Sequence, residues 1–112
     1  MTALTDLAAA WARGDATDAL FLAAWGDHNH DTTWRAYINA LDTYHGSMDA
    51  AIRMNDGLLP GAEIDHMQQF RSLRKWRVRL GVEQKTFTAE AATPARALGL
   101  AVILALVEKE RK

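Results

Sequence analysis

The chain has 112 residues, of which 49% are hydrophobic and 24% charged, and its 13 basic and 14 acidic side chains give a formal net charge of -1. A chain of this length buries roughly two thirds of its unfolded surface, enough for one hydrophobic core, so we expect a single domain over residues 1–112. The sequence contains no cysteine, which excludes a thiol nucleophile, an iron–sulfur cluster and a disulfide-dense secreted scaffold.

Charge is separated along the chain. Residues 1–56 contain eight aspartates and three arginines, a balance of -5, whereas residues 71–85 contain six basic residues and one glutamate, a balance of +5. The longest strongly apolar stretch, Ala97 to Val107, is shorter than the roughly 20 residues that cross a bilayer and is placed at the wrong end for a signal peptide. We therefore expect no membrane partner and a cytoplasmic location.

Helical periodicity dominates the first part, residues 1–45, and continues to Gly61. Apolar side chains recur at three- and four-residue spacings within 4–11, 20–25, 34–44 and 48–58, which predicts four helices separated by glycine stops. Ser47 is expected to cap the fourth helix, with Ile52 facing inward. Trp11, Trp25 and Trp34 fall on the apolar stripes, where core packing is the default expectation.

After Gly61 the period changes from about 3.6 to 2. The segment from Arg74 to Leu80 alternates between two faces, which predicts a strand, and residues 86–91 form a second, joined through a hairpin near Gly81. Residues 62–70 are a weaker strand candidate. Its Ile64, His66, Gln68 and Phe70 are expected on one face. In the strongest strand, Trp76, Val78 and Leu80 should face inward and Lys75, Arg77 and Arg79 outward.

Thr93 and Pro94 mark the start of a final helix that runs to about Lys109. Because it is apolar nearly all round from Ala97 to Val107, most of its circumference should be covered. The predicted fold class is α+β: N-terminal helices, a short antiparallel meander of about three strands, and a C-terminal packing helix, with residues 46–112 forming an α-β-β-β-α sandwich.

The second part of the chain resembles a family of small bacteriophage and prophage proteins, the phage alpha-beta-alpha sandwich domain. The resemblance lies in Gly46 to Ala51, in Leu58-Leu59-Pro60-Gly61, in Trp76 to Leu80 and in Phe87 to Leu98, and it covers about residues 44–108. The family usually has an aromatic residue after Pro60-Gly61, where this chain has Ala62. The resemblance implies a phage or prophage accessory protein, and it brings no catalytic residues with it.

A cluster of cations is the first candidate binding site: Arg71, Arg74, Lys75, Arg77 and Arg79. On a strand, Lys75, Arg77 and Arg79 would project together about 7 Å apart and could meet the phosphates of a nucleic acid or nucleotide. Such a face could equally be a solvated or salt-bridged surface that keeps the sheet from aggregating. Trp34 and Arg35, in the first turn of their helix, are candidates for a stacking platform or an oligomer anchor.

The segment Asp27-His28-Asn29-His30-Asp31 is a weak metal-site candidate through His28, His30 and Asp31. No further ligand at zinc spacing completes a tetrad, and a polar turn that caps the next helix accounts for the same residues.

No catalytic constellation is recognisable, because Ser47 is a cap, Ser72 lies in a basic turn and the glycines are dispersed. We therefore expect a non-catalytic binding or interaction module, without a cofactor, that binds a protein partner or self-associates. The alternatives are nucleic-acid or nucleotide binding through residues 71–85 and a metal-dependent hydrolase at His28 and His30.

Overall fold

Helices and strands follow one another as the sequence predicts. The computed structural model describes residues 3–25 and 31–110. Its first half forms α1 (Ala3–Arg13), α2 (Asp18–Ala24), α3 (Asp31–Tyr44) and α4 (Met48–Leu58). The second half forms β1 (Glu63–Phe70), the short 3-10 helix η1 (Arg71–Leu73), β2 (Lys75–Val82), β3 (Lys85–Ala91) and α5 (Pro94–Glu110). The predicted α+β class is confirmed.

Two helix starts have side-chain caps, and the sequence predicts the one at Ser47. The Ser47 hydroxyl accepts a hydrogen bond of 3.1 Å from the backbone N–H of Ala50 at the start of α4. The Thr93 hydroxyl accepts one of 3.1 Å from the N–H of Arg96 at the start of α5. Each bond satisfies a backbone donor that has no partner inside the helix.

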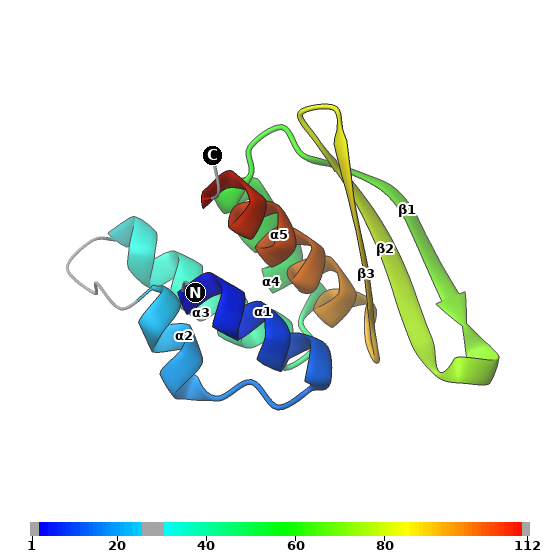
Figure 1. Cartoon of the computed structure of the whole chain (residues 1–112), viewed down its shortest axis with the longest axis horizontal. Helices are drawn as coiled ribbons and strands as arrows, with labels where there is room; N and C mark the ends of the chain where they lie inside the picture. Colours follow the sequence, from blue (N-terminus) through cyan, green and yellow to red (C-terminus); the bar gives the residue numbers. More distant parts are fainter. Residues whose placement is uncertain (1–2, 26–30, 111–112) are drawn as a thin grey trace.

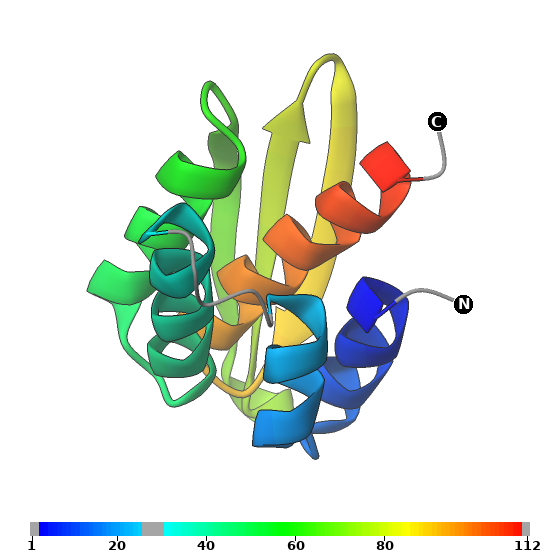
Figure 2. The same ribbon diagram turned by 90° about the vertical axis from the view of Figure 1, so that its left-hand side faces the viewer.

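The three strands form one antiparallel sheet in the order β1-β2-β3. The helices lie on one side of this sheet, and α5 runs between the sheet and the other helices (Figure 1). Figure 2, turned by 90°, shows the same arrangement from the side of the helices, with the strands behind them. Val78, Leu80 and Ala89 point from the sheet into this layer and are buried.

The core is built around α5. Most of its residues between Ala95 and Ala105 are buried, and Leu104, Leu106 and Val107 are half-buried, because α1, α3, α4 and the inner face of the sheet all pack on it. The predicted cover of this helix is confirmed, and it presents no open apolar stripe. In the part of the chain that the structure describes, no helix combines the length and the apolar character needed to span a membrane.

Three expectations about the strands are wrong in detail. A β-bulge between Ile64 and His66 turns Ile64 to the inner face, whereas His66, Gln68 and Phe70 share the outer face. The hairpin turn lies at Glu83 and Gln84, which have φ angles of 50° and 69°, and Gly81 lies within β2. Arg74 precedes β2 in a left-handed conformation, with a φ of 52°.

Two apolar side chains predicted to face inward lie at the surface. Trp34 on α3 is 46% exposed and Ile52 on α4 is 43% exposed. Trp11 and Trp25 are buried as expected, and Trp76 is half-buried on the inner face of the sheet. Trp34 therefore contributes little to the core, and it packs at a ring distance of 5.5 Å on Tyr37, one turn further along α3.

Candidate functional site

The outer face of the sheet is not covered by any helix that the structure describes (Figure 1). We call it the open face. It is formed by the residues of each strand that point away from α5, and the strand register brings them into rows. Arg77 of β2 lies between Gln68 of β1 and Glu90 of β3, and Arg79 lies between His66 and Thr88.

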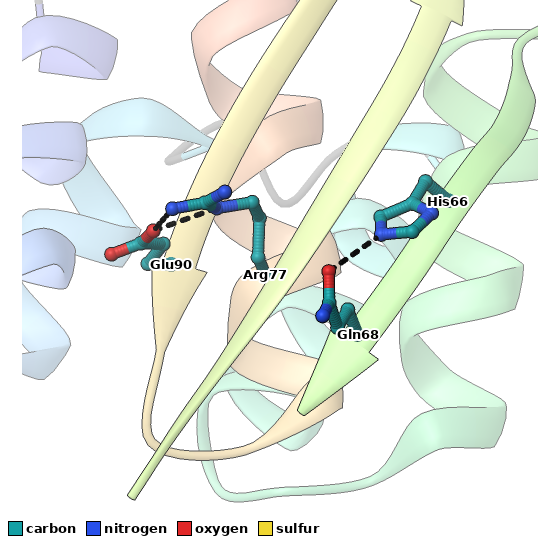
Figure 3. Close-up of polar contacts among 4 residues, drawn as sticks. All are labelled: His66, Gln68, Arg77 and Glu90. Atoms are coloured by element: carbon teal, nitrogen blue, oxygen red, sulfur yellow. Dashed lines mark hydrogen bonds and ion pairs between the residues drawn. The ribbon is translucent and has the colours of Figure 1, made fainter. Parts of the chain in front are cut away.

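Arg77 is held by its neighbours on this face. Its Nε and terminal guanidinium nitrogens donate to the same Glu90 carboxylate oxygen at 2.8 and 2.6 Å, so that the side chain reaches across β3 (Figure 3). The guanidinium also lies 4.7 Å from the centre of the Phe70 ring. The Arg77 and Glu90 side chains are 44% and 36% exposed, so this is a surface ion pair that contributes about 1 kcal/mol or less.

Lys75 and Arg79 are placed differently from Arg77, because neither forms an ion pair with a described residue. Both are exposed and extend from β2 on the same side as Arg77. Alternate residues of a strand lie about 7 Å apart, so the three cations form a row along the middle of the open face. One of these three charges is compensated by Glu90 and two are available to a ligand.

A shallow hollow of about 210 Å³ lies in this row, lined by His66, Arg77, Arg79 and Thr88. We call it the open-face hollow. All three strands contribute to it, and its lining offers guanidinium groups, a hydroxyl and an imidazole. The His66 imidazole contacts the Gln68 amide oxygen at 3.1 Å on the same strand (Figure 3). Guanidinium and hydroxyl donors around one hollow suit a phosphate, whose oxygens accept several hydrogen bonds at once.

The remaining basic candidates lie at one end of the sheet. Arg71 and Arg74 belong to η1 and the residue after it, and both are exposed. A second hollow, of about 300 Å³, brings Arg74 and Lys75 close to Arg13 at the end of α1. The structure therefore extends the row of cations beyond the strand, toward the end of the first helix.

Trp34 and Arg35 are separate from the open face. Both lie on α3, which packs on α4 and α5 rather than on the sheet. Arg35 lines a hollow of about 360 Å³ between α3 and α4, together with Arg53 and Asp56. These two candidates do not join the basic strand in one site.

The metal candidates His28 and His30 lie outside the described residues, as does the side chain of Asp31, where α3 begins. Elsewhere in residues 3–25 and 31–110, no three histidine, aspartate or glutamate side chains gather in a way that could hold a metal ion.

The sequence did not indicate three neighbours of the basic strand. In the sequence, His66 is a single imidazole without an evident partner, and Thr88 and Glu90 are alternate polar residues of the segment 86–91. Their positions next to Arg77 and Arg79 depend on the register, and the bulge before His66 sets that register for β1. Alternation in the sequence predicts the face on which a residue lies, but it does not predict which residue of the neighbouring strand lies beside it.

The geometry defines an α+β protein with an uncovered, cationic sheet face. Comparison of the chain with protein-family models, with curated proteins and with solved structures finds no match. The resemblance to the phage alpha-beta-alpha sandwich domain stays a prediction from the sequence.

Proposed function

We propose that this protein is a non-catalytic binding module that holds the phosphate backbone of a nucleic acid on the open face of its sheet. The observation that carries the proposal is the uncovered row of Lys75, Arg77 and Arg79, with the open-face hollow beside it. Phosphate contacts from arginine and lysine supply most of the sequence-independent affinity of nucleic-acid-binding proteins.

Because α5, the last helix, is buried, the open face is a better candidate for the binding surface than this helix. The sequence leads first to a protein partner or self-association, and an open apolar stripe on Ala97 to Val107 would favour that interpretation. In the structure, the other helices and the sheet cover this stripe. The cationic open face has no covering layer, so it remains accessible to a partner. A phage accessory protein in the cytoplasm of a bacterial host, as the sequence resemblance implies, would meet nucleic acid there.

The aromatic side chains argue for backbone contacts rather than base stacking. Trp76 is half-buried on the inner face, and the ring of Phe70 lies beneath the Arg77 guanidinium at 4.7 Å. Neither ring offers an open platform for an unstacked base. We therefore expect weak dependence on base sequence and strong dependence on salt.

Fluorescence anisotropy of labelled single-stranded and duplex DNA, titrated at several salt concentrations, tests the proposal. The logarithm of the binding constant should fall linearly with the logarithm of salt concentration, by about 0.7 per phosphate contact on a single strand and about 0.9 on a duplex. The double variant Lys75→Ala, Arg79→Ala removes the two cations of the row that no described carboxylate compensates, so its slope should be shallower by about 1.4 or 1.8.

The matched control removes two exposed cations from the helical layer, Arg53→Ala with Lys109→Ala. It changes the net charge by the same amount and should bind almost as the unmodified protein does. Equal affinities for the two double variants, with both folded by circular dichroism, would exclude the open face as the binding surface.

A further inference from the structure

Strand β1 is an edge of the sheet with an open backbone. It pairs with β2 on one side, and no other described segment forms backbone hydrogen bonds with residues 63–70 on the other. Figure 1 shows it at the outer border of the molecule, and six of its eight residues are exposed. An edge of this kind is a template for pairing with a further strand.

Most of this edge lacks the usual protection. Proteins blunt edge strands with prolines, lysines and bulges. In β1 the bulge and the two acidic residues, Glu63 and Asp65, lie at the beginning, and the five residues from His66 to Phe70 contain no proline, lysine or carboxylate. This segment keeps an uninterrupted register with β2 from Arg79 to Lys75. It is therefore a regular, nearly uncharged ladder five residues long.

We propose that this edge pairs antiparallel with the same edge of a second copy, with the two-fold axis at Gln68. This centre uses the whole regular segment. It places Gln68 opposite Gln68 of the second copy, Met67 opposite Gln69, and His66 opposite Phe70. A centre one residue earlier would bring the bulge into the ladder, and a centre one residue later would bring in η1.

The charges at the ends of this ladder are complementary. The same two-fold axis places Asp65 at the level of Arg71 of the second copy, at both ends of the pairing. No like charges oppose each other within the five residues, and directly opposed like charges would destabilise the pair. The contact is self-complementary, as a two-fold interface requires. This favours a second copy over an unrelated strand.

The pairing also bears on the proposed function, and only this consequence rests on that proposal. It joins two sheets of three strands into one of six, with the open faces on the same side. The two copies of β2 are then three strand spacings, or about 14 Å, apart. The rows formed by Lys75, Arg77 and Arg79 in each copy flank a central strip of β1 side chains, and the cationic face is doubled.

Cysteine crosslinking tests the axis directly, since the chain has no cysteine of its own. In the proposed register, the Cα atoms of residue 68 in the two copies lie about 4.5–5.5 Å apart, which a disulfide spans. Gln68→Cys should form a covalent dimer under mild oxidation. Gln69→Cys is the near control, because its two copies are diagonal at about 7–8 Å, and Thr88→Cys on β3 is the distant control.

The unmodified protein should be a dimer by light scattering, with crosslinking at least several-fold faster for Gln68→Cys than for either control. A monomer at every concentration, or equal crosslinking at all three positions, would overturn the pairing. So would a monomer whose edge captures an extended peptide of unlike sequence.

A charge exchange at the axis gives a second measurement. Gln68→Lys and Gln68→Glu should each weaken the dimer by up to about fivefold, and an equimolar mixture should recover it as a heterodimer. None of these experiments contains nucleic acid. A monomer that still binds DNA would overturn the pairing alone, and a dimer that ignores DNA would overturn the proposed function alone.

Discussion

Gly99 of α5 is the point where the packing of three helices can be tested most sharply. A methyl group built on Gly99 would lie 2.5 Å from a ring carbon of Trp11 on α1 and 2.6 Å from the methyl carbon of Thr43 on α3. Carbon atoms in contact are normally 3.5–4.0 Å apart. Gly99→Ala therefore places an atom about 1 Å too close to both neighbours.

Neither neighbour has room to move. Trp11 is 2% exposed and its indole N–H donates to the Arg96 carbonyl at 2.9 Å. Thr43 is fully buried and its hydroxyl donates to the Asn39 carbonyl at 2.6 Å. Overpacking of this kind costs about 3 kcal/mol at the upper end of its usual range, and alanine recovers about 1 kcal/mol of helix propensity. We expect a net loss of about 2 kcal/mol.

Gly57 in the last turn of α4 provides the matched control. A methyl group there meets no atom within 4 Å, so Gly57→Ala gains helix propensity without a clash, and should stabilise the protein by about 0.5 kcal/mol. Urea unfolding at one protein concentration measures both changes. With a slope of about 2 kcal/mol/M, Gly99→Ala should lower the midpoint by about 1 M. Midpoints that move in the same direction for both variants would contradict the packing of α1 and α3 on α5.

Three further changes test the open face and two helix ends. Glu90→Gln removes the carboxylate that compensates Arg77, so the salt slope of single-strand binding should steepen by about 0.7, and an unchanged slope would mean that Arg77 stays out of reach of phosphate. Ser47→Ala removes the cap of α4 and should cost about 1 kcal/mol in urea unfolding, an effect absent if water replaces the hydroxyl. Arg96→Lys loses the 2.6 Å bond from Nε to the Tyr44 carbonyl and should cost about 1–2 kcal/mol, whereas an unchanged midpoint would show that this bond contributes nothing.

The order of elements could be predicted because each leaves a local signature. Helix starts are marked by side chains that accept backbone hydrogen bonds, as Ser47 and Thr93 do. The change of period after Gly61 marks the beginning of the strands, and alternation correctly places Trp76 on the inner face and Arg77 on the open face.

The wrong predictions concern properties that a short segment of sequence does not determine. Which side of a helix is covered depends on elements far along the chain, so the apolar stripes of α3 and α4 wrongly predict that Trp34 and Ile52 lie in the core, whereas both lie at the surface. A bulge adds one residue and exchanges the faces of everything before it, so strict alternation wrongly predicts that Ile64 shares the face of His66. The turn at Glu83 and Gln84 lacks the glycine that usually marks a hairpin.

In the candidate site, too, some features follow from the local sequence and others depend on distant segments. Lys75, Arg77 and Arg79 could be found from the sequence, because a strand places alternate residues on one face. The open-face hollow could not, because it needs Thr88 and His66 from two other strands in one register. Whether the face is covered could not be predicted either, since it depends on all the helices packing on the opposite side.

The charge separation of the sequence becomes a separation in space. Helices α1 to α4 contain six aspartates and three arginines, a balance of -3, whereas η1 and β2 with Arg74 contain five cations and no acidic residue. The helices lie on one side of the sheet (Figure 1). The register and burial of β2 place its cations on the other side. If the open face binds a polyanion as we propose, this separation of charge should favour its approach from that side over the helical side. Pairing of two copies through β1 would preserve this orientation, because the edge lies between the faces and covers neither of them.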